Sequence, residues 1–201
     1  MKKTCMMIVG VAGLASAASA QNTFSLSLFT AAPTVDTTGG EVTFDIDVVG
    51  DASIGTHMLG GAFALQSNSD LVVDMSWASA SWDSFPTDGG YAGNGNYNQV
   101  IFGQLVIPGV PPFDVPAAGS ELGSLIGTYS VTLAANAMGI IDFSLVPQDP
   151  FSLEVLDVDS GLLYRSSDGE LVLEGVTIIT PAPSALALLG VSGLVCARRR
   201  R

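Results

Sequence analysis

Hydrophobic and polar residues alternate along most of the chain. Every second residue is apolar in the stretches 24–28, 42–48, 129–133 and 141–145. In an extended chain this period of two places one set of side chains on a buried face and the other set in water. The pattern therefore predicts β-strands, with the acidic residues Asp45 and Asp47 on the solvated face of one of them.

Clusters of turn-forming residues separate the predicted strands. They are Gly39-Gly40, Gly60-Gly61, Asn68-Ser69-Asp70, Asn136 with Gly139, Asp159-Ser160-Gly161 and Asp168-Gly169. Asn, Asp and Gly tolerate positive φ, and their side chains close local turns. Many short strands at this spacing predict an all-β fold, an antiparallel β-sandwich. The best helix candidate, a turn near residues 134–137, is too short to change this class.

Two stretches depart from the alternating pattern. Residues 88–99 are rich in Gly and Asn, and residues 108–119 contain four prolines, which remove hydrogen-bond donors. We interpret both as long loops within one domain over residues 21–180, because neither flank alone has enough strands to close a sandwich. His57 is also expected in a loop.

The first 20 residues have the three parts of a secretory signal peptide. Lys2 and Lys3 precede an apolar segment over residues 6–18, and Ala18-Ser19-Ala20 forms a small-x-small cleavage site. This arrangement predicts that signal peptidase cuts before Gln21 and that the protein is exported. The alternative is a buried amino-terminal helix.

The charge of the body is strongly negative. All nineteen acidic residues of the chain lie between residues 21 and 180, against one cation, Arg165, so the formal charge of this part is −18. Such a surface repels nucleic acid and anionic lipid, which need a basic footprint. It attracts divalent cations or polycations, or it serves only solubility through self-repulsion.

Both cysteines lie outside the predicted domain. Cys5 falls in the predicted signal peptide and Cys196 in the carboxy-terminal segment. The body therefore has no disulfide and no thiol chemistry, even in an oxidising compartment.

The carboxy-terminal segment, residues 181–201, has three parts in order. A proline motif, Pro181-Ala182-Pro183-Ser184, precedes an uncharged apolar run over residues 185–197, and Arg198, Arg199, Arg200 and Arg201 end the chain. A helix over residues 183–197 would span about 22 Å, less than the ~30 Å of a bilayer core. The arginines should stay cytoplasmic. This length suits a temporary handle better than a permanent anchor, although an ordinary tail anchor is the alternative.

This tail resembles the PEP-CTERM sorting signal, with Ala182 where that motif has Glu. The resemblance implies an exosortase-type membrane enzyme that recognises and removes the tail, in bacteria that make exopolysaccharide. We therefore expect a transient stay in the inner membrane, followed by the envelope surface or the medium.

The body has a second, looser resemblance. Residues 39–48, 63–77 and 122–133, with the turn at Gly139, are similar in their strands and turns to cohesin-like and carbohydrate-binding sandwiches. This resemblance implies a sandwich of the immunoglobulin, cohesin or jelly-roll type.

Four acidic residues form a candidate calcium site. Asp157 and Asp159 alternate beside one turn, and Asp168 and Glu170 flank another. Ca²⁺ takes oxygen ligands from such loops, but Gly161 stands where the loop pattern needs a third acid. Turn formation alone also explains these residues.

Aromatic residues gather between residues 77 and 97. Trp77, Trp82, Tyr91 and Tyr97 form a candidate sugar site, in which rings stack on sugars and nearby amides form hydrogen bonds. The alternative places Trp77 and Phe85 in the core, with the two tyrosines holding the loop.

No catalytic constellation is evident. His57 is the only histidine and has no neighbouring acid at metal-ligand spacing, so a zinc site or a Ser-His-Asp triad has no support. Glycoside hydrolysis by two carboxylates has no specific signal, because pairs of carboxylates at suitable distances occur by chance among nineteen acids. The sequence therefore favours a non-enzymatic surface or matrix protein without a cofactor, and the alternative is a displayed carbohydrate-binding module.

Overall fold

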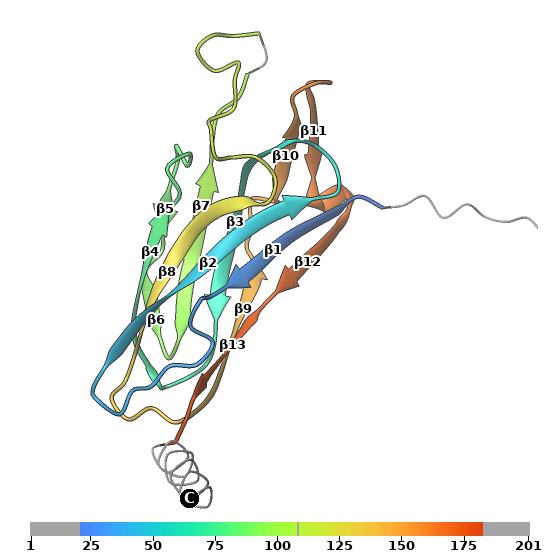
Figure 1. Cartoon of the computed structure of the whole chain (residues 1–201). Coiled ribbons are helices and arrows are strands. Elements are labelled where there is room, and N and C mark those ends of the chain that lie inside the picture. The colour runs from blue at the N-terminus through green and yellow to red at the C-terminus, as the bar shows by residue number, and fades with distance from the viewer. Residues whose placement is uncertain (1–20, 108, 183–201) are drawn as a thin grey trace, which may run out of the picture.

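The computed structural model describes residues 21–107 and 109–182, and nearly all of its regular structure is β-strand (Figure 1). The strands are β1 (Thr23–Phe29), β2 (Val42–Ala52), β3 (His57–Gln66), β4 (Val72–Ser79), β5 (Thr87–Asp88), β6 (Tyr91–Gly93), β7 (Asn96–Gly103), β8 (Ser124–Leu133), β9 (Gly139–Pro147), β10 (Glu154–Asp157), β11 (Leu162–Arg165), β12 (Glu170–Glu174) and β13 (Val176–Thr180). A single 3₁₀ turn, η1 (Ser166–Asp168), precedes β12.

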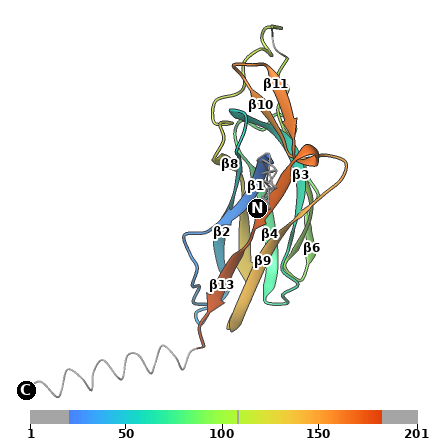
Figure 2. The ribbon, with the colours of Figure 1, turned by 90° about the vertical axis from the view of Figure 1, so that its right-hand side faces the viewer.

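The strands form two facing sheets, which confirms the predicted antiparallel β-sandwich. The first sheet has the order β12-β1-β2-β8-β4, and the second has the order β11-β10-β3-β7-β5. Strand β9 pairs with the carboxy-terminal half of β3, and β13 pairs with β9. All pairs are antiparallel among the named strands except β1 with β12. Figure 2 shows the two layers from the side.

The period of two in the sequence becomes the inside and outside of the sandwich. On β2, Phe44, Ile46 and Val48 are buried, whereas Asp45 and Asp47 are exposed. This alternation confirms the predicted solvated positions. Each strand removes a row of apolar side chains from water, which is the main favourable term in folding.

Hydroxyl groups accompany the carboxylates on the outer face of the first sheet. Ser130 Oγ donates to Asp45 Oδ1, and Thr128 Oγ1 donates to Asp47 Oδ1, both at 2.7 Å. These pairs cross between β2 and β8, which lie side by side. The sheet therefore carries acidic residues without lysine, because neighbouring hydroxyls supply the hydrogen-bond donors.

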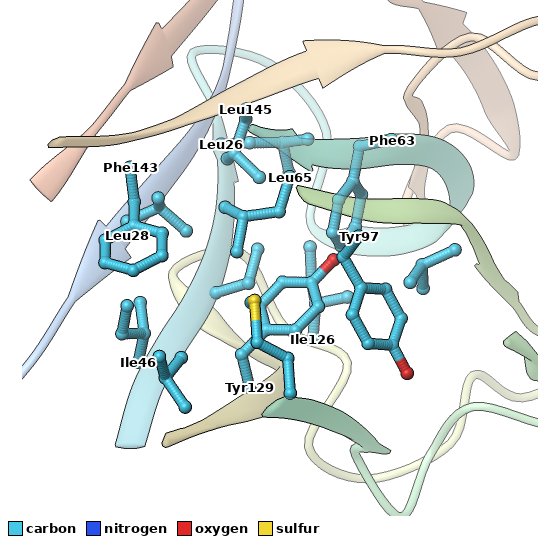
Figure 3. Close-up of a cluster of buried hydrophobic side chains, with 14 of the residues drawn as sticks. Leu26, Leu28, Ile46, Phe63, Leu65, Tyr97, Ile126, Tyr129, Phe143 and Leu145 are labelled. Atoms are coloured by element: carbon cyan, nitrogen blue, oxygen red, sulfur yellow. The ribbon is translucent and has the colours of Figure 1, made fainter. Parts of the chain in front are cut away.

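The two sheets meet at a group of aromatic rings (Figure 3). Phe63 of β3 lies 5.7 Å from Trp77 of β4, 5.8 Å from Phe102 of β7 and 6.5 Å from Tyr129 of β8, measured between ring centroids. Phe63 and Tyr129 are fully buried. The centre of the core is therefore built by rings from both layers.

The prediction of one long loop over residues 88–99 is wrong. This stretch contains the end of β5, all of β6 and the start of β7. Asn94 and Gly95 form the two-residue connection of the β6–β7 hairpin, with φ of 52° and 73°. Two positive φ values in such a connection match the twist of the flanking strands, so Asn-Gly is a hairpin signal within a polar stretch.

One further expectation needs correction, and one loop is confirmed. His57, expected in a loop, begins β3. The apolar run over residues 171–178 is two strands in different sheets, and a Cβ at Gly175 between them would lie 2.4 Å from the Phe143 carbonyl oxygen. Glycine is therefore required where the chain changes sheets. The described residues between 108 and 119 form a loop, as predicted.

The terminal predictions fall largely outside the described residues. The signal peptide, the predicted membrane helix and the four terminal arginines lie beyond them, while β13 ends at Thr180, next to Pro181. Among residues 21–107 and 109–182 there is no helix with the length and apolar character needed to cross a bilayer.

Candidate binding surface at the distal end

Two segments project beyond the same end of the sandwich. They are the loop over residues 104–123, between β7 and β8, and the β10–β11 hairpin (Figure 1). Strand β13 ends at the opposite end, as both views show (Figure 2). We call the end with the loop and the hairpin the distal end.

Thr56 joins the end of the loop to the turn side of the hairpin. Its carbonyl oxygen accepts a hydrogen bond from the Leu122 N–H at 3.1 Å, at the end of the loop. Its Oγ1 donates to the Leu156 carbonyl and accepts from the Val158 N–H, each at 3.1 Å, within the hairpin. The loop and the hairpin are thereby fixed to one point beside the start of β3.

Gln104 clamps the loop at its other base. Its Nε2 donates to the Met58 carbonyl, and its Oε1 accepts from the Ala117 N–H, both at 2.7 Å. Within the loop, the Ile107 N–H donates to the Phe113 carbonyl at 2.6 Å. The proline-rich segment is thus held by its own backbone hydrogen bonds and by Gln104 at its base.

Large apolar side chains are exposed on both segments. The distal apolar cluster, as we name it, consists of Leu105, Ile107, Val110, Phe113 and Val115 on the loop and Val158, Leu162 and Leu163 on the hairpin. Val115 is the most exposed of them, at 71%. Single exposed apolar residues are ordinary, but eight of them on two segments at one end of a domain make that end a candidate interaction surface.

Acidic residues stand among the members of this cluster. Asp114 lies in the loop, Glu121 at its base, and Asp157 and Asp159 in the hairpin turn. The surface therefore combines apolar contact with negative charge. Sequence reasoning recognised the loop but missed its apolar residues as a surface, although five of them between prolines and glycines were the available signal.

His57 lies at the base of the distal end. Its Nδ1 is 3.0 Å from Thr56 Oγ1, and this is its one side-chain hydrogen bond within the described part of the chain. The ring therefore takes part in the hydrogen bonding around Thr56.

The structure places two of the four candidate sugar-stacking rings inside the sandwich. Trp82 and Tyr97 are each 3% exposed. The Trp82 Nε1–H donates to the Leu125 carbonyl at 2.8 Å, and the Tyr97 hydroxyl donates to Asp88 Oδ1 at 2.7 Å. Their polar tips are satisfied by the protein, so these rings offer no open face for a sugar.

The other two rings are half-buried. Trp77 packs across Tyr129, and the Tyr91 hydroxyl donates to the Val72 carbonyl at 2.7 Å, so it holds the β6–β7 hairpin to β4. Trp77 packs against the core without being fully buried, whereas the core interpretation is wrong for Phe85, which is 57% exposed. Trp82 occupies the interior position that the alternative gave to Phe85.

The candidate calcium ligands do not converge. Asp157 Oδ1 accepts from the Asp159 N–H at 3.2 Å, and Asp157 Oδ2 accepts from Ser160 Oγ at 2.5 Å, as expected of a turn. Asp168 belongs to η1, and Glu170 begins β12. Across residues 21–107 and 109–182, no three His, Cys, Asp or Glu side chains are placed to hold a metal ion.

Ca²⁺ and Mg²⁺ should therefore stabilise the protein equally at matched ionic strength. The formal charge of −18 produces self-repulsion that either ion screens. Thermal unfolding of the wild type and of the double variant Asp157→Ala/Asp159→Ala, in each salt, measures this. A larger gain in Ca²⁺ that the double variant abolishes would instead demonstrate a specific calcium site.

Comparison with protein-family models and with curated proteins finds no match for this sequence. Solved structures with a similar arrangement of strands include cohesin modules. One is in a type I cohesin–dockerin complex from Clostridium thermocellum, 10% identical, with a TM-score of 0.49 over 77% of this chain and 99% of that chain.

Two other cohesin modules are similar in the same way. The module of a family 33 glycoside hydrolase from Clostridium perfringens is 11% identical, with a TM-score of 0.47 over 82% of this chain and 99% of that chain. The non-cellulosomal cohesin of the archaeon Archaeoglobus fulgidus is 12% identical, with a TM-score of 0.39 over 80% of this chain and 93% of that chain. The sandwich assignment itself rests on the strand pairing described above.

Proposed function

We propose that this protein is an exported, non-catalytic binding module, displayed at the cell envelope with its distal end outward. One observation carries this proposal. The distal apolar cluster and Thr180, where the last strand ends and the tail begins, lie at opposite ends of the sandwich (Figure 1). A tail held at a membrane therefore directs the cluster away from the bilayer.

The resemblance of the tail to a PEP-CTERM signal supports the proposed export and sorting to the cell envelope. Signal peptidase would release the amino-terminal segment before Gln21, and the apolar run over residues 185–197 would hold the chain in the inner membrane. An exosortase-type enzyme would then act at the proline motif. The body would pass to the envelope surface or the surrounding matrix, where exopolysaccharide is a further partner.

The partner of the distal end is a protein of complementary chemistry. An apolar cluster among acidic residues fits an apolar surface bordered by Lys and Arg, because opposite charge steers encounter while apolar contact supplies the buried core of an interface. The charge of −18 disfavours nucleic acid and anionic lipid at the same surface.

Cysteine labelling tests the display and its orientation, since the body has no native cysteine. In a Cys196→Ser background, Val115→Cys marks the distal end and Ile140→Cys marks β9 beside β13. The two native side chains are 71% and 68% exposed, so they form a matched pair. On native cells whose outer membrane has been removed, a membrane-impermeant polymer maleimide should modify the tethered form at residue 115 more than at residue 140.

Two controls complete the experiment. In solubilised protein both cysteines should react equally, because their native exposures are nearly the same. A tag after Arg201 identifies the tethered form and should be lost from the surface species. Stronger labelling at residue 140 would contradict the orientation, and a tag that persists on one stable inner-membrane species would contradict the sorting route.

A further inference from the structure

A cavity of about 800 Å³ lies along one edge of the sandwich. Leu26 of β1 with Leu171 and Leu173 of β12 lines one side, and residues 147–154, between β9 and β10, line the other. Leu171 and Leu173 face inward beside Leu26 but are only half-buried. The sheets therefore stay open here, and the volume is within the range of small-molecule sites.

The cavity also contains the one Arg or Lys side chain of the body. Arg165 Nε donates to Glu154 Oε1 at 2.8 Å, between the paired strands β11 and β10. The arginine side chain is 51% exposed, and an ion pair this exposed adds little stability. The bond to Glu154 uses one of the five N–H donors of the Arg165 guanidinium. The other donors stand beside the Glu154 carboxylate, which can accept hydrogen bonds.

The wall opposite the leucines is held in place by hydrogen bonds. Gln99 Nε2 donates to the Asp149 carbonyl at 2.7 Å, and the Leu153 N–H donates to Ser166 Oγ at 2.9 Å. Both ends of the segment are thus attached to other strands or turns. A wall fixed in advance reduces the ordering that a ligand would have to impose.

A second hollow of about 270 Å³ adjoins the cavity. It lies over β3 and β7, and its lining includes the exposed rings of Phe85 and Phe151. The two hollows share Phe151, Ser152 and Glu154. A Cβ at Gly60, in the second hollow, would lie 2.8 Å from the Phe102 carbonyl oxygen. Glycine is therefore needed there, and the bottom of the hollow is formed by backbone.

We propose that the cavity and the adjoining hollow bind an uncharged glycan chain. Neighbouring sugar hydroxyls both donate and accept, which matches the Arg165 guanidinium beside the Glu154 carboxylate. The apolar faces of the sugar rings match the Phe151 ring and the leucine wall. This site is separate from the distal apolar cluster, and the inference does not depend on the proposed protein partner.

Charge and polarity together select this class of ligand. An anionic glycan would meet Glu154 and Asp149 in a body of formal charge −18. An apolar peptide would cover the ion pair without satisfying its remaining donors, which is unfavourable. A neutral polyhydroxylated chain meets neither obstacle.

The test uses full-length protein in lipid nanodiscs and neutral glucose tetrasaccharides with α-1,4, β-1,4 or β-1,3 linkages, measured by calorimetry. At least one of these tetrasaccharides should bind, and Phe151→Ala should weaken its affinity about tenfold. The matched control is Phe29→Ala on β1. Phe29 is 53% exposed and Phe151 49%, so both truncations should leave the fold intact while only one affects binding.

A second pair of variants tests the polar contacts. Arg165→Ala/Glu154→Ala should weaken binding by at least about tenfold. The control Asp47→Ala/Thr128→Ala removes a donor–acceptor pair on the outer face of the first sheet and should leave binding unchanged. The inference is overturned if every neutral tetrasaccharide fails to bind, if a galacturonate tetramer binds more tightly, or if only an apolar tetrapeptide binds in a Phe151-dependent manner.

Discussion

Phe63→Ala should lower the free energy of unfolding by about 3–5 kcal/mol. Phe63 is fully buried on β3 and contacts Trp77 of β4 and Tyr129 of β8, which belong to the opposite sheet. Truncation removes buried apolar surface and leaves a cavity between the layers. Since domains are stable by only about 5–15 kcal/mol, this single change removes a large share of the total.

Urea unfolding followed by far-ultraviolet circular dichroism measures this loss. In a separate thermal unfolding experiment, we expect the melting temperature to fall by roughly 6–20 °C at this domain size. Phe29→Ala is the control, because Phe29 is 53% exposed and its truncation should change stability by no more than about 0.5 kcal/mol. Equal losses in the two variants would show that the sheets do not pack around Phe63.

Raising the pH from 10 to 11 should lower stability by about 2 kcal/mol through two buried tyrosines. Burial raises the pKa of Tyr129 well above its ordinary value, with Tyr97 adding to the effect. Burial also raises the pKa of Tyr97, and its hydrogen bond to Asp88 raises it further. No hydrogen-bond partner of the buried Tyr129 hydroxyl is present among the described residues.

The sign follows from where each state releases its protons. Below about pH 10 both tyrosines are neutral in the folded and unfolded chains, so their contribution to stability is complete. Above it the unfolded chain ionises before the folded chain, and the loss of stability per tyrosine steepens towards about 1.4 kcal/mol per pH unit. The body has no lysine or cysteine to titrate in the same range.

The double variant Tyr97→Phe/Tyr129→Phe isolates this effect. The difference in unfolding free energy between pH 8 and pH 11 should shrink in the double variant, whatever its stability at pH 8. Tyr164→Phe, on the β10–β11 hairpin, is the control and should retain the wild-type difference. A double variant that loses as much stability as the wild type would assign the alkaline sensitivity to other groups.

The sequence identified the class of fold because period-two patterning acts locally. Alternation at residues 42–48 is enough to give β2 its buried and solvated faces, since side chains point to opposite sides of any extended chain. The same local chemistry located most turns. It failed at residues 88–99, where a polar composition concealed the Asn94-Gly95 hairpin connection that the residue types themselves signal.

Burial of individual aromatic residues depended on tertiary contacts. Trp82 and Phe85 are three positions apart in one segment, yet one is 3% and the other 57% exposed. The Trp82 indole reaches the Leu125 carbonyl, 43 positions along the chain. A local sequence pattern carries no information about a contact between such distant positions. The candidate sugar-stacking rings could therefore not be sorted into core and surface from sequence.

The sequence by itself determined the strands, the acidic body without lysine or thiol, and the three-part ends that predict export. Only the tertiary structure decided which apolar residues stay uncovered. Leu171 and Leu173 alternate like core residues, but the two sheets do not close over them, so they line a cavity beside Arg165. Prolines predicted the loop over residues 108–119, but its direction depends on Gln104 and Thr56, which attach it to the distal end. Pairing between distant segments sets such openings and directions, because a strand's own pattern determines its faces but not what lies against them.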